Sequence, residues 1–495
     1  MPRRPWTAVV VAILVVAVVA LVVIAKSPDP GPVAAQTDDR SGGGDLALGT
    51  DRGGAEEAEE QAETTEQRLE ALDEARAAGI FGRRERVVLA AAPGWAGEQL
   101  MNVGTDDWEP AVAADPNSSF VYLLTTRYGQ PKPCPGNCPV PHIAIEISDD
   151  NGQTWSEGAP LCACKGSGQF DPIIEVVPDT GHVYALWMNG FNVVFQRSTN
   201  HGATWSAPVP TWGNVSWNDK PVLTSSDDGR DVYVSWNGPT GGDPWIAQSH
   251  DFGATWSQRK IVDSRRYFFA FDAEVTSDGT VLFSESSFDY SGPAASAIGQ
   301  VRHHIFISRN EGATWERRLL GAVDLGEPCV SEGCYDDFYA GHNSVTADDH
   351  DDLVYVFDGA TEPGGPQRVF VRRSIDEGRT WSTSLAVSTA GRMATGPVAE
   401  ATGDGDVRLW FAQRRPSRDW NIWYRRSADG GVTWSTPVRI SDATSGAEYK
   451  DEDGFLEFYG DYGEIDVMRN GKTIAAWGEG FSWLGPGGTW LNIGS

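Results

Sequence analysis

Six copies of one eight-residue pattern, S-x-[DN]-x-G-x-T-W, divide most of this 495-residue chain into units of similar length. The copies begin at Ser148, Ser198, Ser249, Ser308, Ser374 and Ser427. Subtracting consecutive start positions gives spacings of 50, 51, 59, 66 and 53 residues. This period is typical of β-propeller blades, which bury a core only when several repeats stack. The repeat therefore predicts one large all-β domain.

The residue types in the pattern have the chemistry of a tight turn. The aspartate or asparagine at the third position accepts backbone N–H bonds inside its own turn, and the glycine at the fifth supplies a positive φ. The closing tryptophan is a large apolar anchor whose N–H needs one partner. We expect all six turns to have a structural role.

Three apolar, strand-like segments lie between successive turns; in the second unit they are 171–174, 182–187 and 192–195. A seventh unit begins near Tyr462 but lacks the turn pattern and a fourth strand. The isolated apolar segment 87–90 could join this last unit, which would close the ring and cover an edge strand. The sequence predicts seven blades of four antiparallel strands. Six blades with an irregular C-terminal extension are the alternative.

Residues 1–26 have the pattern of a membrane anchor. Two arginines precede 7–25, nineteen residues without charge, glycine or proline, a length that nearly spans a bilayer core of ~30 Å. The arginines favour the cytoplasmic side, so the rest of the chain would lie outside. A signal peptide cleaved after Ala35 is the alternative, and it exports the chain as well. We expect a single-pass cell-membrane protein with an extracytoplasmic propeller.

Residues 27–84 have the composition of a stalk, with Gly, Ser and Pro first and an acidic run after them. Glu, Ala and Gln favour helix, but Leu69 and Leu72 are almost the only apolar side chains of that run. We therefore expect a solvated spacer that is partly helical or disordered, followed by the propeller at 85–495. The formal net charge of −30 argues against nucleic acid as a partner, because phosphate binding needs a basic surface.

The S-x-D-x-G-x-T-W stretches resemble the Asp-box (BNR) repeats of the sialidase superfamily, over roughly residues 100–495. The resemblance implies a propeller in which each turn joins the third and fourth strands of a blade. It also implies an exo-α-sialidase-like glycoside hydrolase with arginines for the substrate carboxylate, an Asp acid/base, and a Tyr nucleophile activated by a Glu. Where the family has an Arg-Ile-Pro motif, this chain has Trp108-Glu109-Pro110, so the first arginine is absent.

Strand direction decides which side chains share a face. If the turns mark one face, the opposite face carries the starts of the first strands around a central funnel, which is the expected site. The catalytic candidates at these starts are Glu109, Asp171, Asp272, Asp461 and Tyr462, the last as nucleophile. The same face supplies the substrate-binding candidates Arg127, Arg265, Arg266, His342, Arg392 and Arg414. Polar residues at strand starts are also common as plain turn residues.

The chain has six cysteines, an even number that fits an exported, oxidised domain. They are Cys134, Cys138, Cys162, Cys164, Cys329 and Cys334, all on loops of the candidate face. We expect a local Cys329–Cys334 bridge and cross-pairing between the other two pairs. A four-cysteine metal site is the alternative, although its spacing departs from common zinc signatures. No cofactor is expected beyond a calcium ion on the acidic loops 348–352 or 451–454.

Two functions remain open on the sequence. The first is a membrane-anchored glycoside hydrolase acting on cell-surface or extracellular glycans. The second is a non-catalytic propeller that binds a carbohydrate or a protein of the cell envelope. Convergence of three arginines near a Tyr–Glu pair in the funnel would favour a sialidase.

Overall fold

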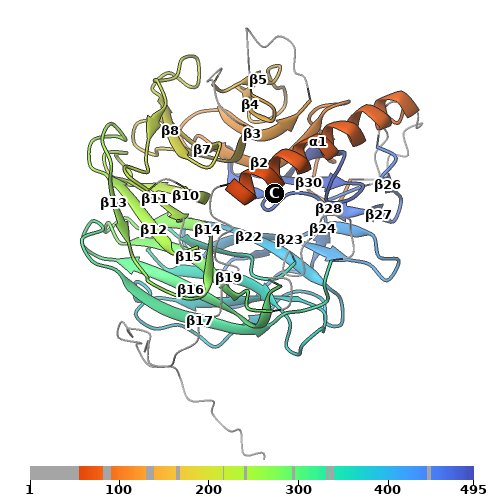
Figure 1. The fold of residues 1–495 in the computed structure, drawn as a ribbon. Helices are drawn as coiled ribbons and strands as arrows, with labels where there is room; N and C mark the ends of the chain where they lie inside the picture. Colours follow the sequence, from red (N-terminus) through yellow and green to blue (C-terminus); the bar gives the residue numbers. More distant parts are fainter. Residues whose placement is uncertain are drawn as a thin grey trace, which may run out of the picture.

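The computed structural model describes residues 55–81, 91–129, 139–162, 168–215, 217–238, 242–292, 296–329, 334, 339–442 and 447–494, with α1 side chains from Thr64 onward. Seven antiparallel sheets form a ring, and the first strand of each sheet contacts the first strands of its neighbours. Figure 1 shows the chain following this ring in sequence order. The prediction of seven four-stranded blades is confirmed.

The first three blades follow the chain directly from the inner to the outer strand. Blade 1 consists of β2 (Asp106–Ala114), β3 (Val121–Tyr128), β4 (His142–Ser148) and β5 (Ala159–Pro160). Blade 2 consists of β6 (Gln169–Val176), β7 (Val183–Asn189), β8 (Val193–Ser198) and β9 (Val209–Pro210). Blade 3 consists of β10 (Asp219–Ser225), β11 (Val232–Asn237), β12 (Pro244–Ser249) and β13 (Ser257–Lys260).

The next three blades repeat this order. Blade 4 consists of β14 (Tyr267–Val275), β15 (Val281–Asp289), β16 (Ile298–Ser308) and β17 (Glu316–Asp324). Blade 5 consists of β18 (Asn343–Ala347), β19 (Leu353–Gly359), β20 (Arg368–Ser374) and β21 (Leu385–Ala386). Blade 6 consists of β22 (Ala394–Thr402), β23 (Asp406–Arg414), β24 (Trp420–Ser427) and β25 (Val438–Arg439), extended by β26 (Lys450–Asp451) and β27 (Gly454–Phe455).

Blade 7 combines both ends of the propeller. Its chain-terminal strands are β28 (Glu457–Phe458), β29 (Glu464–Val467), β30 (Thr473–Gly480) and β31 (Gly487–Gly494). The outer edge is β1 (Gln99–Leu100), which pairs with β31, and Trp95 bridges Gly494 beside it. The predicted closure by an N-terminal segment is therefore confirmed, but the closing strand is β1. The expected segment 87–90 lies outside the described residues.

Apolar side chains fill the space between neighbouring blades, which explains the continuous apolar runs in the sequence. A middle strand such as β7 is covered on both faces, and six of its seven residues are buried. One core cluster joins Ala111 and Ile145 of blade 1 to Ile174 and Trp187 of blade 2. Such a core forms only between blades, so the ring must close to bury it.

The repeated turns join the third and fourth strands, as the resemblance implied. In the first copy the N–H of Gly152 donates to Ser148 Oγ at 2.9 Å, and Thr154 Oγ1 donates to Asp150 Oδ2 at 2.7 Å. The indole N–H of Trp155 donates to the carbonyl of Gly152 at 3.1 Å. The hydrogen bonds from Thr154 lower the pKa of Asp150 to about 2. These polar groups of the motif are thus satisfied within the turn.

Helix α1 (Ala55–Ala78) lies against the propeller and contacts β3 (Figure 1). Arg68 and Leu72 are buried, at 2% and 0% exposure, and Leu69 packs against the core between blades 1, 2 and 3. The helix expected in this segment is present, and its Arg68, Leu72 and Ala75 side chains dock on the propeller instead of facing solvent. None of the described helices is long and apolar enough to span a membrane; the expected anchor at 7–25 lies outside the described residues.

Candidate functional site

A β-bulge interrupts the inner strand of each of the first three blades near its start. The strand register shifts between Trp108 and Ala111 in blade 1, and blades 2 and 3 shift at the equivalent places. Inside the bulges, Glu109, Asp171 and Lys220 adopt φ values of 56°, 52° and 52°, and each precedes a proline. A positive φ is costly for such side chains and concentrates at functional sites. The bulges therefore aim three charged groups from equivalent positions.

Glu109 and Asp171 form a buried carboxylate pair. The N–H of Asp171 donates to Glu109 Oε2 at 3.0 Å, and Thr126 Oγ1 donates to the same oxygen at 2.9 Å. One carboxylate oxygen from each of Glu109, Asp171 and Asp461 lies within 4.8 Å of the others. Burial, and then the charge of Asp171, raise the pKa of Glu109 well above its ordinary value. Glu109 is therefore the member of the pair suited to hold a proton.

Lys220 places a cation beside this pair. Its ammonium forms an ion pair with Asp461 and lies 5.0 Å from the centroid of the Tyr462 ring. The neighbouring Asp219 has a pKa raised to about 7 by burial and by Asp171. Three acidic oxygens within 4.8 Å could ligate a divalent metal, but the Lys220 ammonium already supplies the positive charge.

Tyr462 lies between the carboxylate pair and a pocket. Burial, and then the charges of Asp171 and Glu109, raise the pKa of the Tyr462 hydroxyl well above its ordinary value. The hydroxyl oxygen and Asp171 Oδ2 are both buried without a well-formed hydrogen bond. The protonated phenol lies beside the Asp171 carboxylate. It can transfer its proton to that carboxylate as the phenol oxygen attacks a substrate.

Tyr462 and Asp461 form one wall of this pocket. Asp272 and His342 line it from blades 4 and 5. Asp272 Oδ2 accepts hydrogen bonds from Ser344 Oγ at 2.7 Å and from the N–H of Val345 at 3.2 Å. Asp272 therefore joins two blades, whereas Tyr462 and Asp461 face both the pocket and the pair.

Carboxylates deeper along the axis serve the same joining role. Asp466 accepts from the N–H of Ala114 at 2.6 Å, and Glu274 accepts from the N–H of Ala347 at 3.1 Å. Burial raises the pKa of Asp466 to about 6 and that of Glu274 to about 8. The axis of the propeller is thus acidic well beyond the bulge residues.

The predicted arginines are dispersed over blades 1, 4 and 6. Arg127 forms buried ion pairs with Asp107 and Glu146 at 2.6 and 2.9 Å. Arg266 donates to the carbonyl of Ser287 at 2.6 Å. These contacts commit both guanidinium groups to partners within their own blades.

The other three arginines also lie away from the carboxylate pair. Arg414 donates to Glu327 Oε2 at 2.5 Å. Arg265 is exposed and Arg392 half-buried, on the connections that enter blades 4 and 6. His342 Nδ1 lies 3.5 Å from Asp358 Oδ2, and its ring centroid lies 5.1 Å from that of Phe271. Among the predicted binding residues that the structure describes, His342 is the one that lines the pocket.

Helix α1 contributes a site residue that the sequence analysis missed. The guanidinium carbon of Arg68 lies 3.9 Å from the ring centroid of Trp108, the residue before Glu109. Its Nη1 donates to the hydroxyl of Tyr459 at 2.5 Å. Arg68, Leu72 and Ala75 follow each other by four and three residues and are the buried side chains of the helix from Thr64 onward. That helical spacing is the signal that could have revealed the docking.

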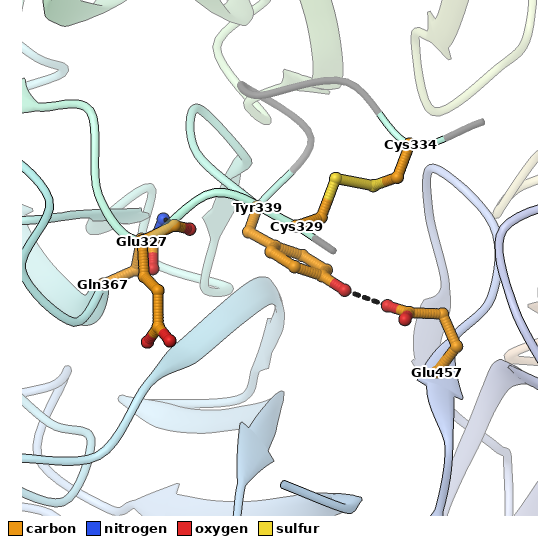
Figure 2. The surroundings of a disulfide bond; sticks show 6 residues. All are labelled: Glu327, Cys329, Cys334, Tyr339, Gln367 and Glu457. Atoms are coloured by element: carbon orange, nitrogen blue, oxygen red, sulfur yellow. Dashed lines mark hydrogen bonds between the residues drawn. A yellow bond between two sulfur atoms is a disulfide. The ribbon is translucent and has the colours of Figure 1, made fainter. Parts of the chain in front are cut away.

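The Cys329–Cys334 disulfide is present, as predicted, with a Cα–Cα distance of 6.0 Å. Figure 2 shows Tyr339 beside it, pointing from the same connection toward Glu457, to which its hydroxyl donates. Cys162 is also disulfide-bonded. The other predicted positions, Cys134, Cys138 and Cys164, lie outside the described residues, so the predicted cross-pairing stays a prediction.

One of the two acidic loops has the oxygens for a cation. Asp451 and Asp453 lie with Asp419 so that one oxygen of each is within 4.8 Å of the others. In the loop 348–352, Asp348 instead accepts the N–H groups of His350 and Asp352 at 2.9 and 3.0 Å. A calcium ion on the loop 451–454 stays a prediction.

Comparison with known proteins supports the repeat. The family described as BNR/Asp-box repeat matches residues 146–157, around the first of the six turns, which confirms the predicted repeat. No curated protein matches the chain.

Several solved structures have a similar chain trace. A protein of unknown function from Dyadobacter fermentans is 15% identical, over 81% of this chain and 99% of its own, with a TM-score of 0.46. An ulvan lyase of a new polysaccharide lyase family is 12% identical, over 82% and 95%, with a TM-score of 0.48. The NanB sialidase from Streptococcus pneumoniae is 13% identical, over 78% and 68%, with a TM-score of 0.39. These values carry no conclusion about chemistry.

Proposed function

We propose that this protein is a glycoside hydrolase that acts on extracytoplasmic glycans through the Glu109–Asp171 pair and Tyr462. The observation that carries the proposal is the Tyr462 hydroxyl, buried against two carboxylates of which one has a raised pKa. A phenol, a proton acceptor and a proton donor are the three groups that tyrosine-dependent glycoside cleavage requires.

The proposed reaction assigns one role to each group. The Tyr462 oxygen attacks the anomeric carbon while its proton passes to Asp171. The glycosidic C–O bond breaks, and the leaving oxygen takes the proton of Glu109. Water then attacks the glycosyl–tyrosine intermediate, giving one proton to Glu109 while Tyr462 recovers its own from Asp171. Lys220, paired with Asp461, keeps the local charge balanced.

The substrate class stays broader than sialic acid in this proposal. A sialidase grips a carboxylate with several arginines, and the described contacts of Arg127, Arg266 and Arg414 occupy those side chains elsewhere. The proposed location is the outer side of the cell membrane, with 7–25 as the anchor. The apolar length of that segment supports this.

The test is turnover of a panel of fluorogenic glycosides by the full-length protein in detergent. Tyr462→Phe removes the nucleophile and keeps the ring that Lys220 contacts, so turnover of any accepted glycoside should fall at least 100-fold. Tyr122→Phe is the matched control, because Tyr122 is buried in blade 1 away from the pair. Equal activity in Tyr462→Phe and wild type would overturn the proposal.

A non-catalytic carbohydrate- or protein-binding propeller is the second candidate. The docking of α1 beside the site favours it, because the helix occupies surface that a substrate would use. Absence of turnover on every glycoside, together with saturable binding of envelope glycans, would select this function.

A further inference from the structure

Arg68 of α1 sits in a cage formed by Asp106, Trp108, Tyr128 and Tyr459, called here the Arg68 cage. The guanidinium carbon lies 3.9, 5.1 and 5.3 Å from the ring centroids of Trp108, Tyr128 and Tyr459. Three aromatic rings within about 6 Å of one positive group are a recognition pattern for cations. The cage therefore has the chemistry of a cation site.

Asp106, the acidic residue of the cage, has only one of its two carboxylate oxygens in hydrogen bonds. Asp106 is fully buried, and its Oδ1 accepts from the Tyr459 hydroxyl at 2.5 Å and from the N–H of Gly487 at 2.9 Å. Its other oxygen, Oδ2, is buried without a hydrogen-bond partner. A ligand with a compact, multi-donor cation could satisfy that oxygen.

Arg68 is an incomplete occupant of this cage. Its Nε is buried without a hydrogen-bond partner, although the Tyr459 hydroxyl accepts from its Nη1 and the negative charge of Asp106 lies nearby. Leu69, Leu72 and Ala75 pack on the propeller and hold the helix in place. A competing cation therefore has to replace the contacts of the Arg68 guanidinium, not the docking of the helix.

The cage adjoins the proposed reaction site. Trp108 directly precedes Glu109 on β2, and Tyr459 lies three residues before Tyr462. The neighbouring site contributes the carboxylates of Asp171 and Asp461 and the proton-holding Glu109, and Lys220 is paired with Asp461. A substrate with a positive group suits this field better than an anionic one.

We propose that the Arg68 cage is a subsite for the ammonium group of an amino sugar, and that Arg68 of α1 holds the subsite until such a sugar displaces it. The choice of a sugar rests on the proposed function; the cation preference rests on the cage alone. An ammonium group has three donors, enough for Asp106 Oδ2 and a face of Trp108.

The test compares binding of a positively charged and a neutral probe built on the same sugar backbone. A tetramer of glucosamine carries ammonium groups, and the tetramer of N-acetylglucosamine is its neutral counterpart. Binding is followed by calorimetry in the Tyr462→Phe background, which prevents turnover. Arg68→Ala should tighten binding of the glucosamine tetramer at least tenfold and leave the neutral tetramer unchanged.

Two further variants keep the test specific. Arg76→Ala is the matched control, because Arg76 contacts the carbonyl of Gly104 from the last turn of α1, outside the cage. It should leave both affinities unchanged. Asp106→Asn, added to Arg68→Ala, should remove the preference for the charged tetramer. Circular dichroism of each variant checks that it folds.

Each contrary outcome has a definite meaning. Equal affinity for both tetramers in Arg68→Ala, or the same gain in Arg76→Ala, overturns the subsite. Tighter binding of a tetra-arginine peptide than of the glucosamine tetramer assigns the cage to a peptide and overturns the sugar. Selective binding of the charged tetramer without turnover by wild type retains the subsite and rejects the hydrolase.

Discussion

The backbone N–H of Asp171 donates to Oε2 of Glu109 at 3.0 Å, and these residues occupy equivalent bulges in neighbouring blades. Each has a positive φ, 56° for Glu109 and 52° for Asp171. The bond therefore couples two strained positions across a blade boundary. Strain of this kind persists only where the surrounding structure fixes it, which here means the closed ring.

Glu109→Gln should lower kcat on any accepted glycoside by 100- to 10,000-fold, because it removes the proposed proton donor. Burial and the charge of Asp171 raise the pKa of Glu109. Glu109 therefore keeps its proton at pH values above the ordinary pKa of a glutamate. Wild-type activity should then fall as pH rises through that raised pKa. The measurement is kcat/KM as a function of pH for both proteins. If the residual activity of Glu109→Gln falls at high pH as the wild-type activity does, Glu109 is not the proton donor.

Glu285 should make stability depend on pH. It is 1% exposed, and burial raises its pKa to about 8, although Ser235 Oγ donates to it at 2.8 Å. A raised folded-state pKa means full stability below the unfolded pKa near 4.5, and loss as pH rises to about 8. Between pH 5 and pH 8 the wild type should lose about 3 kcal/mol more than Glu285→Gln. Urea unfolding of the wild type and of Glu285→Gln at both pH values measures this difference. Equal losses of stability in the two proteins would refute the prediction.

A glycine of a repeated turn, Gly253, and a glycine of the turn between β14 and β15, Gly279, permit a matched pair of substitutions. Gly253 has φ +76°, and a Cβ there would lie 2.1 Å from Phe195 Cε1 in the core. Gly279 has φ +83°, but a Cβ there meets nothing within 4 Å. Gly279→Ala should cost about 1 kcal/mol of backbone strain, whereas Gly253→Ala should cost about 2 kcal/mol more through the clash. The midpoints of denaturant unfolding compare the two variants. Equal losses of stability would contradict a packing role for the repeated turn.

The sequence was sufficient for the fold because the information is local and repeated. Each turn carries its own hydrogen-bond partners, as Ser148, Asp150 and Thr154 show, so its geometry does not depend on distant residues. Strand order then follows from short connections. The face rule also grouped Glu109, Asp171, Asp461 and Tyr462, which the structure brings together.

The arginines and α1 could not be placed in this way. A loop arginine has many partners within reach, and only the folded chain shows that Arg127 pairs with Asp107 and Glu146. Helix α1 docks through few side chains. The polar composition of the segment therefore predicted exposure to solvent, and the spacing of Arg68 and Leu72 was too weak a signal to predict docking. The closing strand β1 is two residues long, too short to give a periodic signal.

The closure of the ring also depends on a buried ion cluster. Lys450 on β26 forms ion pairs with Glu98, next to β1, and with Glu479 on β30, and all three side chains have 0% exposure. Glu479 also accepts from the Trp477 indole at 2.8 Å. Because charges this deep cannot be hydrated, Lys450→Met should destabilise the protein by about 3 to 5 kcal/mol.

The triple variant Lys450→Met, Glu98→Gln, Glu479→Gln removes the uncompensated charge together with the cation. It should recover a large part of the lost stability, since a neutral cluster no longer needs a buried counter-ion. Thermal and urea unfolding of the single and triple variants give the comparison. If the triple variant is no more stable than Lys450→Met, packing of the lysine stem, and not charge pairing, holds the first and last strands of the propeller together.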